Sequence, residues 1–104
     1  MKLLVIPLKT EYYDAFANGS KTSELRRYGR GWNERTCIVG RPVVLSKGYS
    51  KGSCMTDRIT QFGVYPGAMF GGADRDAIED LFGTLNVEIA EITIELDDPP
   101  SASA

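Results

Sequence analysis

The strongest constraint on the fold is the C-terminal stretch LNVEIAEITIELD, residues 85–97. Its apolar residues alternate with polar ones, as in a strand with one buried face. The alternation changes parity between Ile89 and Ile92, so we predict a β-bulge near Ala90 and Glu91 that keeps both isoleucines inward. Bulged strands allow a sheet to curl into a barrel. A chain that ends in such a strand is expected to fold around a curved sheet.

The length and the remaining pattern complete the expected architecture. A chain of 104 residues is large enough for one modest core and too short for two. The predicted strands cover residues 2–8, 21–28, 36–39, 42–47, 55–65 and 85–97. Two helices are predicted. Thr10 caps the first and Gly19 closes it, and the second covers residues 74–82 with an apolar stripe of Ala77, Ile78, Leu81 and Phe82. We therefore predict one α+β domain over residues 1–97, a small, mostly antiparallel β-barrel with two short helices, and a disordered tail at residues 98–104.

The composition excludes several kinds of active site. The sequence contains no histidine, which rules out Ser-His-Asp triads, His-activated cysteines and His-ligated metals. Cys37 and Cys54 lack CxxC spacing and are expected to be two free thiols. The longest apolar run, LLVIPL, is too short for a signal segment or a membrane span. We expect a cytoplasmic protein with no cofactor and no metal. A divalent metal ion is possible only if the protein is a nuclease.

The charges are segregated along the chain. Residues 21–58 hold nine Lys or Arg against three Asp or Glu, whereas residues 59–104 hold one Arg against nine acids. A basic segment of this kind attracts phosphates even in a slightly acidic protein. The alternative is that the two regions pair with each other across the fold.

The segment NGSKTSELRR gathers a lysine, a glutamate and two arginines directly after the first predicted helix. On a strand, the side chains of Glu24 and Arg26 share one face and can pair. Lys21 would project into a groove, where a phosphate or a carbonyl oxygen could use its charge. The alternative is a solvated Glu24–Arg26 pair of little energetic value beside a lysine on a turn.

The following loop, GRGWNER, carries the single tryptophan of the chain. Trp32 and Tyr28 offer rings on which bases stack, and Arg30 and Arg35 offer guanidinium groups for phosphates, a mixture typical of single-stranded nucleic acid binding. Arg58 is predicted to extend the same surface. Alternatively, Trp32 folds back onto the core.

The segment GSKTSELR, residues 19–26, resembles the GxKxxExR signature of the ASCH domain family, whose members have a PUA-like β-barrel fold. Gly19, Lys21, Glu24 and Arg26 stand at the four signature positions. The surrounding pattern agrees over most of the chain, since the family has a strand and a short helix before the signature and a glycine just before a later strand. The resemblance implies a cleft lined by the signature, and a link to RNA.

Binding of single-stranded RNA or a nucleotide-like ligand in this cleft is the function that we predict first. Some ASCH proteins are reported as ribonucleases, so cleavage of single-stranded RNA, with Lys21 and Glu24 as catalytic residues, is an alternative. A neighbouring subgroup hydrolyses N4-acetylcytidine with a lysine and a threonine. Glu24 stands at the position of that threonine, and a carboxylate does not simply replace a hydroxyl nucleophile, although Thr22 or Ser23 could substitute. A further alternative is a protein-interaction module with an acidic partner. The predicted ligand-binding residues are Lys21, Glu24, Arg26, Tyr28, Arg30, Trp32, Arg35 and Arg58.

Overall fold

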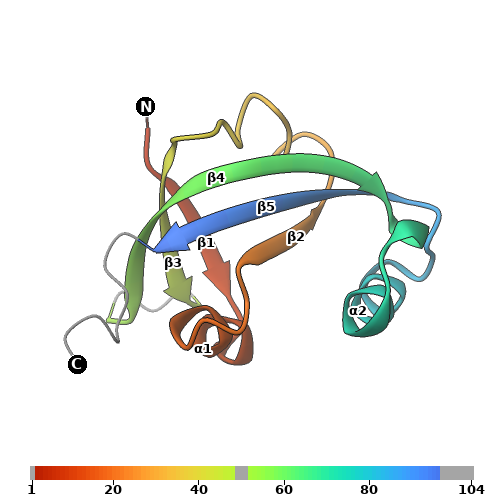
Figure 1. Cartoon of the computed structure of the whole chain (residues 1–104), viewed down its shortest axis with the longest axis horizontal. Helices are drawn as coiled ribbons and strands as arrows, with labels where there is room; N and C mark the ends of the chain where they lie inside the picture. The colour runs from red at the N-terminus through yellow and green to blue at the C-terminus, as the bar shows by residue number, and fades with distance from the viewer. Residues whose placement is uncertain (1, 49–51, 97–104) are drawn as a thin grey trace.

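The structure is a computed structural model that describes residues 2–48 and 52–96. Its elements, in chain order, are β1 (Leu4–Leu8), α1 (Thr10–Ala17), β2 (Ser23–Arg27), β3 (Pro42–Lys47), β4 (Cys54–Pro66), the 3-10 helix η1 (Gly67–Met69), α2 (Gly72–Phe82) and β5 (Glu88–Leu96). The long strands β4 and β5 run side by side across the molecule, with α1 at one end of the sheet and α2 near the other (Figure 1). The predicted tail at residues 98–104 lies outside the described residues.

The five strands form one mixed sheet in the order β1-β3-β4-β5-β2. β1 and β3 are parallel, and the other three pairs of neighbours are antiparallel. β1 and β2 are therefore the two edges, and the sheet curves into an open half-barrel rather than a closed barrel (Figure 1). The predicted α+β class, with a mostly antiparallel sheet and two short helices, is confirmed.

The hydrophobic core joins the sheet to α1. It consists of Ile6, Leu8, Phe16, Cys37, Val43, Leu45, Met55, Ile59, Ile92 and Ile94. A fully buried aliphatic or aromatic side chain of this size contributes roughly 1.5–3 kcal/mol through the area removed from water. Cys37 belongs to this core, Cys54 is exposed, and no disulfide joins the two.

The bulge lies in β4 and not in β5, where we predicted it. The β2–β5 ladder keeps a regular register, whereas the β4–β5 ladder shifts between Ile59 and Gln61 and leaves Thr60 of β4 as the extra residue. Ile89 and Ile92 therefore face opposite sides of β5, and both are fully buried. The apolar residues of β5 change from odd to even positions because the strand is buried on both faces. A bulge would produce the same pattern in the sequence.

Residues 36–39 form turns instead of the predicted strand. The backbone N–H groups of Thr36 and Cys37 donate to the carbonyl of Asn33 at 3.1 and 2.8 Å, and the Asn33 side chain accepts from the Arg35 and Thr36 N–H groups. Asparagine side chains compete with extended structure in this way because they offer the backbone local hydrogen bonds. This local hydrogen-bond network outweighs the preference of the β-branched residues in this segment for a strand.

The helix ends are partly as predicted. Gly19 and Gly83 adopt positive φ, at 84° and 71°, and follow the last turns of α1 and α2 as expected for closing glycines. Thr10 is not the N-cap, because it is the first helical residue and Lys9 occupies the cap without a side-chain hydrogen bond. Within the described residues, no helix combines the length and apolarity needed to cross a membrane.

α2 stands apart from the core, beyond the end of the β4–β5 pair (Figure 1). η1 connects it to β4, and Ile78 is its buried residue. The other members of the predicted stripe are not core residues: Ala77 and Phe82 are half-buried, and Leu81 is 64% exposed. The helix packs on the short η1 instead of on the sheet, so that most of its apolar side stays open.

Candidate functional site

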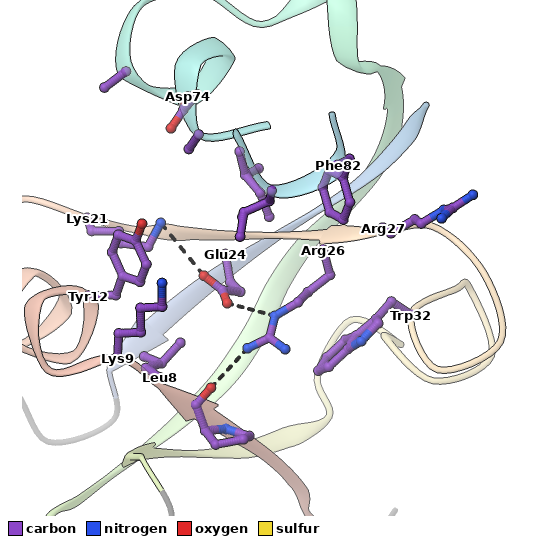
Figure 2. Close-up of a pocket in the computed structure, with 15 residues that line it drawn as sticks. Leu8, Lys9, Tyr12, Lys21, Glu24, Arg26, Arg27, Trp32, Asp74 and Phe82 are labelled. Atoms are coloured by element: carbon purple, nitrogen blue, oxygen red, sulfur yellow. Dashed lines mark hydrogen bonds and ion pairs between the residues drawn. The ribbon is translucent and has the colours of Figure 1, made fainter. Parts of the chain in front are cut away.

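A pocket of about 580 Å³ lies between the α1 end of the sheet and α2, and β2 passes through its lining (Figure 2). Its lining residues are Pro7, Leu8, Lys9, Tyr12, Lys21, Glu24, Leu25, Arg26, Arg27, Trp32, Ala73, Asp74, Ala77, Leu81 and Phe82. Most of these side chains are apolar or aromatic, and the charged ones come mainly from the segment around β2. This is the composition of a ligand site, in which an apolar lining holds a few polar groups that orient the ligand.

Glu24 is the buried charge of the pocket, with 7% of the residue exposed. It lies opposite Ile92 in the β2–β5 ladder, so its side chain shares the inner face of the sheet with the core. Its Oε2 accepts from Arg26 Nε at 2.8 Å, and its Oε1 lies 3.7 Å from Lys21 Nζ (Figure 2). Two cations around one carboxylate offset the desolvation cost of burying it.

Arg26 joins the two edges of the half-barrel. Besides contacting Glu24 on its own strand, it donates from Nη2 to the carbonyl of Pro7 in β1 at 3.0 Å (Figure 2). Its guanidinium carbon also lies 4.8 Å from the centre of the Trp32 ring, a cation–π contact. The Glu24–Arg26 pair expected from the sequence is present, and the Arg26 side chain is largely used in holding the fold together.

Lys21 is held in the pocket by its neighbours and keeps donors for a ligand. Its ammonium lies 5.3 Å from the Tyr12 ring centre and 5.6 Å from that of Phe16, so two aromatic rings and Glu24 position it. Its backbone N–H donates to Ala15 at the end of α1, which fixes the start of the chain towards β2. An ammonium carries three donors, and a contact of 3.7 Å to Glu24 does not use them fully.

Four of the eight predicted ligand-binding residues line this pocket, namely Lys21, Glu24, Arg26 and Trp32. Tyr28 instead lines a second pocket of about 540 Å³, together with Arg27, Pro66, Asn86, Val87 and Glu88. The Tyr28 hydroxyl donates to both carboxylate oxygens of Glu34 at 2.7 Å. This hydrogen bond raises the pKa of Tyr28 and lowers the pKa of Glu34.

Arg30, Arg35 and Arg58 do not line the main pocket. Arg30 and Arg35 are exposed in the turns after β2. Arg58 alternates along β4 with Asp57 and Ile59, which are fully buried, so its exposed side chain lies on the opposite face of the sheet. Side-chain alternation therefore separates Arg58 from the motif residues on the inner face.

Sequence reasoning did not place Lys9, Tyr12 or α2 in the site. Lys9 precedes α1, and Tyr12 faces the ammonium of Lys21. From α2, the pocket gains Ala73, Asp74, Ala77, Leu81 and Phe82. The spacing of apolar residues in α2 has the form of a core-facing stripe, and no signal in the sequence distinguishes such a stripe from the wall of a pocket.

The hydroxyls considered as substitute nucleophiles lie outside the pocket lining. Ser23 Oγ shares a hydrogen bond of 3.2 Å with Thr93 Oγ1, and Thr22 is exposed just before β2. Among residues 2–48 and 52–96, no group of three or more His, Cys, Asp or Glu side chains is arranged to hold a metal ion. The side chains of the pocket offer cations, a buried carboxylate, and aromatic and aliphatic surface.

Comparison with known proteins identifies the fold. No family model matches the chain, and no curated protein matches it. Solved structures with this fold include the hypothetical protein PH0355, with a TM-score of 0.66 at 15% identity over 91% of this chain and 99% of that one. They also include a mutant of ZmASCH from Zymomonas mobilis, with a TM-score of 0.65 at 19% identity over 95% of this chain and 71% of that one. The chain thus has an ASCH-like fold.

Proposed function

We propose that this protein binds single-stranded RNA and takes one nucleoside of the strand into the pocket between α1, β2 and α2. The observation that carries the proposal is the Lys21–Glu24 pair, set beside Tyr12 and Trp32 in a cavity of about 580 Å³. A cavity of that size is in the usual range for small-molecule and cofactor sites. The ASCH-like fold supports the same interpretation, because the sequence resemblance to that family implies RNA.

The chemistry of the lining suits a nucleotide. Trp32 and Tyr12 present ring surface for a base, and stacking on an aromatic side chain contributes roughly 1–3 kcal/mol per base. Lys21 and Lys9 are donors for phosphate or carbonyl oxygens, and the Glu24 carboxylate can accept from a base N–H. Arg26 acts mainly by holding Glu24 and Trp32 in place.

The test is fluorescence anisotropy of a 5′-labelled single-stranded RNA at about 50 and 200 mM salt, the range over which phosphate contacts are visible. We expect salt-sensitive binding that Lys21→Ala weakens by about tenfold, the loss of one charge-assisted contact. Lys2→Ala removes the same charge from an exposed position outside the pocket and is the matched control.

Two outcomes would contradict the proposal. Equal effects of Lys21→Ala and Lys2→Ala would show that the ligand does not occupy the pocket. The absence of binding at low salt would exclude RNA as the ligand. A denaturing gel of the same samples distinguishes binding from cleavage, because a ribonuclease would shorten the labelled strand.

A further inference from the structure

The two sides of the pocket carry opposite charges. Lys9 and Lys21 come from the segments that flank α1, whereas the α2 side contributes Asp74 (Figure 2). Asp76 and Asp80 each follow by three positions a lining residue of α2, Ala73 and Ala77, and so neighbour them on the helix surface. The α2 side of the pocket is therefore apolar and bordered by carboxylates.

The single basic residue of α2 does not reverse this charge. Arg75 is directed to η1, where its Nη1 donates to the carbonyl of Ala68 at 3.1 Å, and it does not line the pocket. A phosphate placed against α2 would thus face Asp74 without a cation from the same helix. On the opposite side, Lys9 and Lys21 offer two cations to a phosphate.

This distribution of charge favours one orientation of a bound polyanion. In the favoured orientation the phosphodiester lies on the side of Lys9 and Lys21, and the group that faces Asp74 is uncharged and able to donate hydrogen bonds. The 2′,3′-diol at the 3′ end of an RNA strand meets both conditions, since adjacent ribose hydroxyls donate to a carboxylate much as they do in dinucleotide-binding folds.

Resting on the RNA-binding function above, we propose that the pocket is specific for the 3′ end of an RNA strand with a free 2′,3′-diol. The terminal nucleoside occupies the pocket, its diol donates to Asp74, and the preceding phosphate lies near Lys9 and Lys21. An internal nucleotide carries a phosphate on its 3′ oxygen, and so does a 3′-phosphorylated end. Either would bring a negative charge against the α2 side.

The experiment compares three 5′-fluorescein RNAs of one sequence that end in a 2′,3′-diol, a 2′,3′-dideoxynucleotide or a 3′-phosphate. We expect the diol to bind tightest and the dideoxy end about tenfold weaker, because one carboxylate then loses its donors. The 3′-phosphate is expected to bind weakest, through repulsion by Asp74. The label blocks the 5′ end in all three, so a 5′ terminus cannot account for the binding.

Two variants test whether Asp74 of α2 causes the difference in affinity among the three RNA ends. Asp74→Asn should raise the affinity for the 3′-phosphate and lower that for the diol, which brings the three RNAs closer together. Asp74 is exposed, so the variant should fold, and its circular dichroism spectrum checks this. Glu95→Gln removes one negative charge from an exposed position of β5 outside the pocket and should leave the order of affinities unchanged.

The outcomes separate this inference from the function on which it rests. If the three RNAs bind equally while Lys21→Ala weakens all of them, the end specificity is overturned and RNA binding in the pocket stands. If Asp74→Asn leaves the order unchanged, the assignment to Asp74 is overturned. If no RNA binds, both proposals fail together.

Discussion

At the scale of single residues, Arg26 connects the candidate site to the rest of the fold. Its guanidinium group contacts Glu24 on β2 and the Pro7 carbonyl on β1, the two edge strands of the sheet. Among residues 2–48 and 52–96, backbone pairing does not close this half-barrel, and the Arg26 side chain spans the opening. The same contacts orient the carboxylate that faces Lys21, so the stability of the fold and the geometry of the candidate site depend on the same group.

We predict that Arg26→Ala lowers the free energy of unfolding by about 2 kcal/mol, because Glu24 and the Pro7 carbonyl lose a charged donor. Urea denaturation measures the change. Arg30→Ala removes an exposed arginine outside the pocket and should stay within about 0.5 kcal/mol of the native protein. Equal losses in the two variants would contradict the bridging role of Arg26.

The Tyr28–Glu34 hydrogen bond predicts a pH dependence. It raises the pKa of Tyr28 above its ordinary 10.0 and lowers the pKa of Glu34 below 4.5. The stabilisation linked to Glu34 is therefore present above pH 4.5 and lost as the pH falls through the lowered pKa. The part linked to Tyr28 is present below pH 10 and lost as the pH rises through the raised pKa.

Glu34→Ala should accordingly bring the pKa of Tyr28 down towards 10.0, since the side chain that accepts from its hydroxyl is gone. An NMR titration of the Tyr28 ring carbons follows the change directly. An unaltered pKa for Tyr28 would mean that the hydrogen bond does not persist in solution.

At the scale of elements, α2 is the part whose position decides the shape of the pocket. Ile78 is its buried residue, and the helix packs on η1, which follows the end of β4. Gly67 of η1 is buried, and its N–H donates to the carbonyl of Val87 at 2.7 Å, which ties η1 to the segment before β5. The position of α2 thus depends on close packing around one glycine.

We predict that Gly67→Ala displaces α2 and costs about 1–3 kcal/mol, the usual range for overpacking. A Cβ at this position would lie 2.8 Å from the carbonyl oxygen of Leu85 and 3.2 Å from Ile78 Cγ2. Hydrogen exchange should accelerate in α2 more than in the sheet. Gly71→Ala is the control, because its Cβ meets nothing within 4 Å and its φ of −129° is open to any residue. Similar exchange rates in both variants would contradict the prediction that packing around Gly67 fixes the position of α2.

For the whole molecule, the open half-barrel implies an uneven distribution of stability. β4 and β5 lie in the interior of the sheet, each paired on two sides, whereas β1 and β2 are edges and α2 has little buried surface. Local opening is easiest where few apolar contacts must break. The most protected part of the protein should therefore be the β3–β4–β5 region, away from the candidate site.

Amide hydrogen exchange of the native protein tests this distribution. We predict the slowest exchange in β4 and β5, intermediate rates in β2, and the fastest exchange among the helices in α2. Protection of α2 equal to that of β5 would show that α2 packs more firmly than its single buried residue implies. Bound RNA should slow the exchange of α2 if the helix forms a wall of the occupied site.

Features that depend on local chemistry could be predicted from the sequence. The closing glycines of both helices were correct because Gly19 and Gly83 have the positive φ that a helix end requires. The alternation along β2 placed Glu24 and Arg26 on one face, and the structure pairs them at 2.8 Å. The class of the fold and the pairing of Glu24 with Arg26 could thus be predicted from the sequence. Of the eight predicted ligand-binding residues, four line the pocket, and their role in binding stays a prediction.

The tertiary structure alone decided how distant segments meet. Burial on both faces of β5 produced the same sequence pattern as a bulge, and the bulge lies in β4 instead. The apolar side of α2 became the wall of a pocket instead of part of the core, because η1 holds the helix beyond the end of the sheet. Periodicity determines which side of an element is apolar. What that side faces is set by contacts between residues far apart in the chain, which no local pattern encodes.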